Sequence, residues 1–560
     1  MGIPVYFSHI IQNYNHILKK IQEKQYFDLF FLDANSIVYD AYYNLLKQEI
    51  NVKNDELENM IIEKTIEKIN DVIKLFTIEK EVVVCFDGVA PISKLKQQRE
   101  RRFKTWIRNE VCNKNDKNSW NTCSITPGTK FMKKLNYKLD NYKNNFYKIN
   151  PSRKEKIIIL NSEYEGEGEQ KIFSYLRNNY PNKNNLSISI PKINLNICVY
   201  GLDSDLIMLS LLYSNFYEKI YLYRETPEFI KNLNNKLNPN EKYLLNIPNL
   251  SHQLTRNVYS NNNIHFSKNV NSLVFRSNMN YVILFFLLGN DFMPHHPGLS
   301  LRLNGAEELI RIYNLLLQDR DLFYILNNKI YIDWTSLKIV MKELSINEID
   351  NIKDYHNYKN NIKRKIFSNK KIMCNSEEIL NFIPVLQNEE EEFVLSNDKY
   401  IKERYYETSF SIEYNIKNIC YHYLKNIEWN LFYYLGQEEC NYYYYYPYHH
   451  APLFQDCLHF IPLKFETLYD KNITSKSYIH YITQLLYILP STYYELIDKQ
   501  ELQLYSLLEN PNSKILFNNP SELISKIDNN FVKYFFESVI HFHYVNIFTL
   551  QKQVLNIIKI

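Results

Sequence analysis

Glycine is scarce in this chain, with only ten glycines among 560 residues, whereas glycine makes up about 7% of average protein sequence. A glycine retained against such a bias indicates a backbone conformation or a close approach that other residues cannot adopt. All but Gly436 precede residue 306. Seven of them stand within two residues of an acidic side chain, among them Gly88, Gly166, Gly168, Gly201 and Gly289. We therefore expect the chemistry of this protein in the first half of the chain.

Paired cysteines, long apolar runs and a strong net charge are also lacking. The eight cysteines include no Cys-x-x-Cys pair, which argues against thiol or zinc chemistry and favours a reducing compartment. The longest uninterrupted apolar run, 281–288, is too short to cross a bilayer, and no secretory segment follows Met1. The net charge of +4, from 66 basic and 62 acidic residues, does not by itself indicate a nucleic-acid partner.

The pattern of apolar residues predicts the architecture. A chain of 560 residues exceeds one typical core, so two or more domains are expected. Strand-like runs alternate with helical patterns, which predicts an α/β fold with a mainly parallel sheet flanked by helices. The expected strands end near Asp33, Phe86, Leu160 and Asp203. We expect an α/β domain, a polar connector and a mostly helical segment that wraps the first domain, over residues 1–345, 346–400 and 401–560 respectively.

One stretch combines an acid with a row of cations. The apolar run 82–86 predicts a buried strand that ends at Asp87, and Gly88 and Pro91 separate it from a basic helix. At about 100° per residue, four polar side chains share one arc of that helix: Lys94, Gln98, Arg101 and Arg102. The helix is either an ordinary solvated basic helix or a binding surface for phosphate.

Seven acids stand at predicted strand ends or helix starts: Asp33, Asp87, Glu167, Glu169, Asp203, Asp205 and Asp291. Each has an ordinary explanation as a helix cap or as a charge that opposes a helix dipole. Parallel strands, however, bring their carboxyl ends to one edge, where converging carboxylates repel one another unless protons or cations intervene. Oxygen ligands of this kind suit Mg²⁺ or Mn²⁺, and two such ions can act on a phosphodiester. Together with the basic helix, the acids favour a phosphodiesterase.

Ordered motifs along the chain resemble the XRN family of 5′→3′ exoribonucleases. In the first half the resemblance rests on the opening Met-Gly-Ile-Pro and on Leu32–Asn35, Asp87–Arg102, Ile125–Thr129, Gly166–Glu169, Tyr200–Asp205 and Leu288–Phe292. In the second half it rests on Arg404–Glu407, Glu428–Tyr434 and Tyr445–Pro452.

The resemblance implies a catalytic core of the PIN-like 5′-nuclease type in which all seven acids bind two metal ions, with Mg²⁺ expected and Mn²⁺ as the alternative. It also assigns Lys94, Gln98, Arg101 and Arg102 to a pocket for a 5′-terminal monophosphate. The implied activity is processive removal of mononucleotides from single-stranded RNA. A DNA-directed or structure-specific 5′-nuclease of the same superfamily, and an RNA-binding protein without catalysis, are the alternatives.

Two aromatic positions depart from the family pattern. Tyr39 stands where relatives usually have histidine, and residues 442–446 are all tyrosine where relatives have a tryptophan-rich stretch. We predict that Tyr39 opposes Tyr442 or Tyr444 across the first base, because every aromatic face can stack on a base. Packing in the core is the competing explanation for the tyrosines of this stretch.

The resemblance and the composition also set expectations about partners. The small β domains of the larger cytoplasmic members do not follow in this sequence, so we expect a minimal form of the family. Single-stranded RNA is the expected partner, with no membrane, no small-molecule cofactor and a monomeric state. A cytoplasmic location is expected. The basic runs 363–365 and 370–371 leave a nuclear location as the alternative, although a solvated connector explains them equally.

Overall fold

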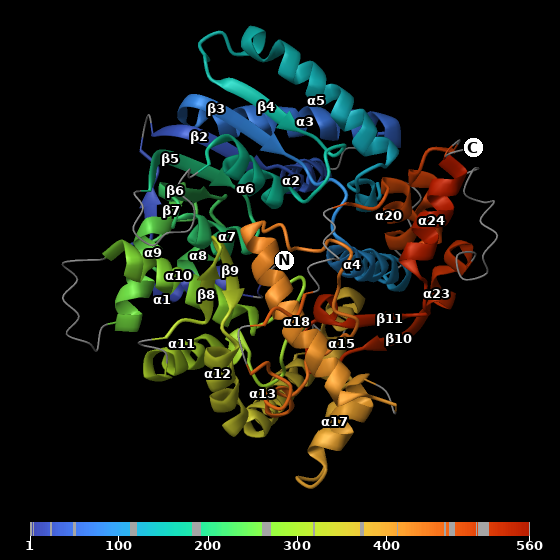
Figure 1. The fold of residues 1–560 in the computed structure, drawn as a ribbon. Coiled ribbons are helices and arrows are strands. Elements are labelled where there is room, and N and C mark those ends of the chain that lie inside the picture. Colours follow the sequence, from blue (N-terminus) through green and yellow to red (C-terminus); the bar gives the residue numbers. More distant parts are fainter. Residues whose placement is uncertain are drawn as a thin grey trace.

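The fold is seen in a computed structural model (Figure 1). It describes residues 3, 5–22, 25–48, 52–112, 120–181, 192–259, 270–316, 320–369, 375–410, 413–463, 466–469, 477–499, 501 and 515–558. No helix among these residues is both long enough and apolar enough to span a membrane.

A seven-stranded sheet of order β1-β7-β6-β5-β2-β3-β4 forms the centre of the first half. Five of its strands pair in parallel, whereas β7 and β1 are added antiparallel at one edge. The strands are β1 (Leu18–Lys20), β2 (Tyr26–Asp33), β3 (Thr77–Cys85), β4 (Lys156–Leu160), β5 (Ile193–Tyr200), β6 (Tyr217–Tyr223) and β7 (Tyr243–Asn246). The predicted α/β class with a mainly parallel sheet is confirmed.

Both faces of the sheet are covered by helices, because its strands are apolar on both sides. Phe30 and Leu32 of β2 point into one core, and Leu29 and Phe31 point into the other. Figure 1 shows α3 and α5 on one side and α6 and α7 on the other. The helices of this half are α1 (Tyr6–Asn13), α2 (Asn35–Leu46), α3 (Asn54–Lys74), α4 (Ile92–Val111), α5 (Lys130–Ile149), α6 (Gly168–Asn179), α7 (Asp205–Tyr213), α8 (Ile230–Leu233), α9 (Ile247–Tyr259), α10 (Val270–Phe286) and α11 (Gly305–Leu316).

The second half is mostly helical and includes two hairpins, β8–β9 and β10–β11. The long helix α18 runs across the middle of the molecule (Figure 1), and α20 packs against both α4 and α24. Its elements are β8 (Phe323–Leu326), β9 (Lys329–Ile332), α12 (Trp334–Ile346), α13 (Glu348–Ser368), α15 (Ser376–Leu386), α16 (Glu389–Leu395), α17 (Ile401–Phe410), α18 (Ile416–Leu435), α19 (Phe454–Cys457), α20 (Tyr481–Ile488), α23 (Pro520–Leu523), β10 (Ile524–Asp528), β11 (Val539–Phe542) and α24 (Ile547–Ile558).

The stretch predicted as a polar connector contains three helices, α13, α15 and α16. Some of its charged residues are buried rather than solvated. Lys359 and Glu391 form an ion pair in which both side chains are 0% exposed. Lys363 also pairs with Glu392. Residues 370 and 371 of the basic run lie outside the described residues. The domain limits themselves stay predictions.

Candidate active site

Six of the seven acids come from the ends of strands and the starts of helices, as their sequence positions predict, whereas Asp291 follows the end of α10. Asp33 ends β2, and Asp87 lies two residues beyond β3. Glu167 directly precedes α6 and Glu169 lies in its first turn, while Asp205 begins α7. Because β2, β3 and β5 are parallel neighbours, their carboxyl ends face one edge of the sheet.

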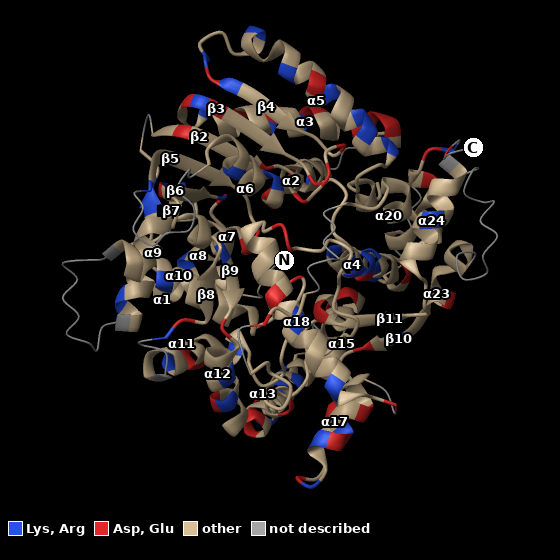
Figure 2. Ribbon diagram, viewed as in Figure 1, with Lys and Arg blue, Asp and Glu red and all other residues tan. Residues whose placement is uncertain are grey.

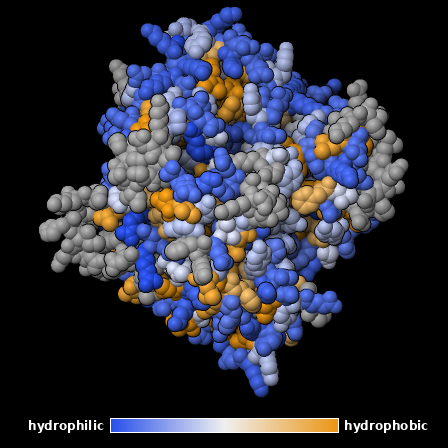
Figure 3. Space-filling model, viewed as in Figure 1, coloured by the Kyte–Doolittle hydropathy of each residue, from blue (hydrophilic) through white to orange (hydrophobic). Residues whose placement is uncertain are grey.

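At that edge lies a cavity of about 480 Å³, which acids and cations line together. The acids on its wall are Asp33, Asp87, Glu167, Glu169 and Asp203, and the helix α4 contributes Lys94, Gln98, Arg101 and Arg102. The two remaining acids, Asp205 and Asp291, are close enough to Asp203 for their negative charges to repel it. In Figure 2 the blue that marks Lys and Arg is concentrated along the ribbon of α4. Figure 3 shows a mostly hydrophilic face with scattered apolar side chains.

Hydrogen bonds fix Asp87 at the carboxyl edge. Its two carboxylate oxygens accept from the backbone N–H of Gly168 at 2.7 Å and from Asn35 Nδ2 at 2.5 Å. The Oδ1 of Asn35 accepts from the backbone N–H of Asp87 at 3.1 Å. A Cβ on Gly168 would lie 2.5 Å from Asp33 Oδ1, so only glycine allows the two acidic segments to approach this closely.

Lys94 lies among the acids rather than with the arginines alone. Its Nζ lies 2.6 Å from Glu167 and 2.7 Å from Asp291, and its side chain is 10% exposed. Although burial raises the pKa of the Asp291 carboxyl, the Lys94 ammonium lowers it further, so the net shift is downward. Lys94 therefore neutralises part of the acidic cluster while it also lines the cavity.

Three of the acids are poorly compensated by the protein. Burial, followed by repulsion from neighbouring carboxylates, raises the pKa values of Asp33, Glu169 and Asp205 well above their ordinary range. Both carboxylate oxygens of Asp205 are buried without a hydrogen-bond partner in the described part of the chain. Buried carboxylates of this kind require protons or cations. The donor set, all hard oxygen atoms, fits Mg²⁺ or Mn²⁺.

The acids are spread around the cavity rather than gathered at one point. Among the described residues, no three of them place ligand oxygens within 4.8 Å of one another. The Lys94 ammonium, which bridges Glu167 and Asp291, supplies part of the positive charge of the cluster. The structure therefore brings the seven acids to one region, and their assignment as metal ligands stays a prediction.

The cationic wall of the cavity is formed by α4. Arg102 donates through Nη2 to the Ile125 carbonyl at 3.0 Å and through Nη1 to the Tyr39 hydroxyl at 3.3 Å. Arg101 is exposed, and Gln98 is half-buried on the same wall. These guanidinium and amide groups match the geometry of phosphate oxygens.

The predicted stacking tyrosines lie in different surroundings. Tyr39 lines the cavity. Tyr444 donates to the His422 carbonyl at 2.9 Å, and Tyr442 packs against Tyr478 with ring centroids 4.9 Å apart. Neither Tyr442 nor Tyr444 is among the residues that line the cavity. Their role in base stacking stays a prediction.

Two supporting residues were not identified from the sequence. Lys171 of α6 is buried and donates to the carbonyls of Phe86 and Asn161 at 2.6 and 2.9 Å, which ties together the ends of β3 and β4. Burial lowers the pKa of Lys171 to about 8. Tyr433 of α18 donates to Glu167 Oε2 at 2.5 Å. No sequence pattern around Lys171 or Tyr433 predicts these hydrogen bonds. Tyr433 does lie in a segment that resembles the XRN family.

A mostly parallel sheet with an acid-lined cavity at its carboxyl edge defines the PIN-like nuclease class. Two family models match the chain: the XRN 5′-3′ exonuclease N-terminus over residues 1–226, and the Xrn1 helical domain over residues 277–394 and 387–558. The chain therefore belongs to the XRN family of 5′-3′ exonucleases.

Curated relatives agree with this assignment. The chain is 29% identical over 340 residues to 5′-3′ exoribonuclease 1 of Saccharomyces cerevisiae, which covers 57% of this chain and 21% of that protein. It is 26% identical over 416 residues to 5′-3′ exoribonuclease 2 of Candida glabrata, covering 64% and 39%. For 5′-3′ exoribonuclease 1 of Homo sapiens the identity is 25% over 529 residues, covering 83% and 29%. The matched regions thus span less than half the length of these relatives.

Proposed function

We propose that this chain is a 5′→3′ exoribonuclease that degrades single-stranded RNA with a 5′-monophosphate and releases mononucleotides processively. The observation that carries the proposal is the shared cavity, in which acids from four parts of the chain face the cationic wall of α4. Membership of the XRN family and the printed names of the relatives support the same activity.

The proposed cofactor is a pair of divalent ions, Mg²⁺ or Mn²⁺. The residues proposed to hold them are Asp33, Asp87, Glu167, Glu169, Asp203, Asp205 and Asp291. When bound, such ions activate water and stabilise the charge that develops on a phosphodiester. The partnerless oxygens of Asp205 and the raised pKa values of three acids support a cation requirement at this edge.

The residues of α4 are proposed to select the 5′ end. Arg101 and Arg102 bind the terminal phosphate by charge-assisted hydrogen bonds, and Gln98 donates a further one. Ile125 and Tyr39 fix the Arg102 side chain, so its guanidinium is held in place before RNA arrives. A cavity of about 480 Å³ leaves little room beyond a terminal phosphate and nucleotide, which disfavours a cap or a triphosphate.

The test is an RNA degradation assay with matched 5′ ends. Identical RNAs with a 5′-monophosphate, triphosphate or hydroxyl are incubated with the protein and Mg²⁺, with EDTA as the control, and products are resolved by chromatography. We expect the monophosphate RNA to be degraded to mononucleotides much faster than the triphosphate and hydroxyl RNAs. Cleavage of a DNA flap in preference to this RNA would instead identify a structure-specific nuclease. Tight RNA binding without any product would identify an inactive RNA-binding protein.

A further inference from the structure

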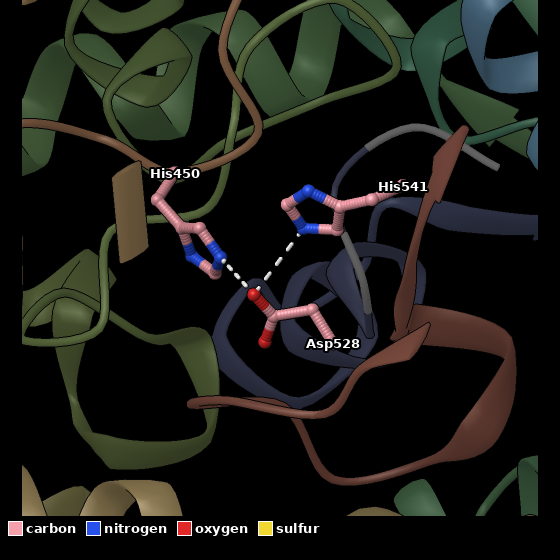
Figure 4. Close-up of side chains that lie close together, drawn as sticks. All are labelled: His450, Asp528 and His541. Atoms are coloured by element: carbon pink, nitrogen blue, oxygen red, sulfur yellow. Dashed lines mark hydrogen bonds and ion pairs between the residues drawn. The ribbon is translucent and has the colours of Figure 1, made fainter. Parts of the chain in front are cut away.

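A second polar cluster lies outside the acidic cavity, where β10 and β11 meet the 447–452 loop. His450 Nε2 lies 2.9 Å from Asp528 Oδ2, and His541 Nε2 lies 3.4 Å from the same oxygen. Figure 4 shows both imidazole rings turned toward that carboxylate. The three ligand atoms all lie within 4.8 Å of one another, and no other group of three histidine, cysteine, aspartate or glutamate residues in the described ranges does so.

We propose that His450, Asp528 and His541 bind one Zn²⁺ ion, with water in the fourth position. Two imidazoles and one carboxylate form a ligand set suited to zinc, which prefers nitrogen donors and tetrahedral coordination. Zinc bonds of about 2.0–2.1 Å separate tetrahedral ligand atoms by about 3.3 Å. The distances of 2.9 and 3.4 Å in the cluster lie close to that separation.

His541 and Asp528 are oriented as the ligands of a cation would be. His541 Nε2 is buried and makes no hydrogen bond among the described residues, although it points at the carboxylate. Asp528 Oδ1 accepts from the backbone N–H of Asn530 at 2.9 Å, which leaves Oδ2 as the oxygen that faces both rings. Ligating carboxylates are typically oriented by such a hydrogen bond from the second oxygen.

The nearest lysine does not neutralise Asp528. Lys526 Nζ is 4.0 Å from Asp528 Oδ2 but only 2.8 Å from Glu390 Oε2, so its ammonium is engaged elsewhere. His449 adjoins the cluster, with its ring centroid 4.3 Å from that of His541.

The position of the site indicates a structural role. His450 lies in the loop whose Tyr446 and Tyr448 carbonyls accept from Lys96 Nζ of α4 at 3.3 and 2.8 Å. Asp528 and His541 lie on the β10–β11 hairpin, whose Phe542 packs on Phe103 of α4 with centroids 4.8 Å apart. A zinc ion at this cluster would join two elements that both support α4. Cysteine spacing could not indicate this site, because its ligands are histidine and aspartate.

The test measures metal on the whole chain, in a D203N/D205N background that weakens metal binding at the acidic cavity. After dialysis against excess zinc and then buffer, mass spectrometry counts the metal that remains on the chain. Cobalt replaces zinc in a parallel sample, because tetrahedral Co²⁺ has a characteristic visible absorption. We expect one zinc per chain and the tetrahedral cobalt spectrum, and an increase in Tm with zinc.

His541→Asn is the test variant, since His541 is partly exposed, and His543→Asn on the neighbouring exposed turn is the matched control. H541N should weaken zinc binding by at least about 100-fold while circular dichroism still shows a folded chain. H543N should bind zinc as the parent does. A parent that retains no zinc, or equal zinc in H541N and the parent, would overturn the proposal, and neither result bears on the exoribonuclease activity.

Discussion

Two groups of buried charges in this protein contrast sharply. In the second half, Glu391 accepts from the Lys359 ammonium, from His356 at 3.1 Å and from the backbone N–H of Phe531 at 2.6 Å. At the sheet edge, Asp205 is equally buried, yet neither of its oxygens has a hydrogen-bond partner in the described part of the chain. Both arrangements desolvate carboxylates, but the protein compensates the first group through several partners and the second only in part, through Lys94.

The contrast distinguishes a structural charge from a binding charge. A compensated buried ion pair holds helices together, and removing one partner is costly because the other is left unpaired. An uncompensated cluster lowers stability and is retained only where a ligand supplies the missing charge. We therefore propose that the acidic cavity is the binding site, whereas the Lys359–Glu391 pair is part of the framework.

The largest expected effect follows from removing charge at the cavity. The double variant D203N/D205N should lose RNA hydrolysis by about 10³-fold or more, because metal ions supply several kcal/mol of transition-state stabilisation. Binding of a 5′-monophosphate RNA, measured by fluorescence anisotropy, should be retained. The control is D398N, since the Asp398 side chain is 83% exposed. Full hydrolysis by the double variant would show that these acids are not the binding charges.

Glu391→Ala should have the opposite pattern. Unfolding in urea should show a loss of about 3–5 kcal/mol, because Lys359 is left buried without its partner. The turnover per folded molecule should not change, since Glu391 makes no contact with the cavity. If the variant were as stable as the parent but turned over more slowly, the Lys359–Glu391 pair could not be assigned a purely structural role.

An intermediate effect is expected on the cationic wall. Arg101→Ala should reduce kcat/KM for 5′-monophosphate RNA by about 10–100-fold, the value of one charge-assisted hydrogen bond of about 1.5–3 kcal/mol. The low kcat/KM for 5′-hydroxyl RNA should not change. The ratio of kcat/KM for monophosphate RNA to that for hydroxyl RNA should therefore decrease. R256A, on an exposed part of α9, is the control. An equal loss on both RNAs would exclude a pocket for the terminal phosphate.

The smallest effect concerns pH and stability. Asp33, Glu169 and Asp205 have pKa values above those of the unfolded chain, so the folded state binds more protons between the two values. Their contribution is fully present below the unfolded pKa of about 4 and is lost as pH rises through the folded pKa. Without metal, the free energy of unfolding should therefore decline with rising pH, and D205N should flatten this decline. Urea titrations with EDTA across a pH series measure it, and added Mg²⁺ should restore stability at the higher pH. Identical pH profiles for D205N and the parent would contradict the account.

The sequence predicted the centre of the fold better than its edge. The runs that end at Asp33, Phe86, Leu160 and Asp203 correspond to β2, β3, β4 and β5, because central parallel strands are continuous apolar runs. The strands β6 and β7 were not identified. The sequence of β6, Tyr217–Tyr223, includes Glu218 and Lys219, and β7 has only four residues, so neither is a clear apolar run.

The site residues were also predictable only in part. Asp33, Asp87 and Asp203 were identifiable because they stand at the ends of apolar strands, and these ends must meet at one edge of the sheet. The helical arc correctly grouped Lys94 with the arginines on one cavity wall, but periodicity does not define how α4 is placed against the sheet. The contacts of Lys94 with Glu167 and Asp291 depend on that placement. Likewise, the partners Lys359 and Glu391 are 32 residues apart, so only the packing of α13 on α16 reveals them.

The most direct test of the central claim is to count manganese ions on the chain without RNA, by electron paramagnetic resonance. The H541N variant serves as the parent, so that the histidine cluster does not contribute. The account predicts two bound ions, lost in H541N/D203N/D205N and retained in H541N/D398N. Equal manganese binding with and without Asp203 and Asp205, or none in the parent, would contradict it.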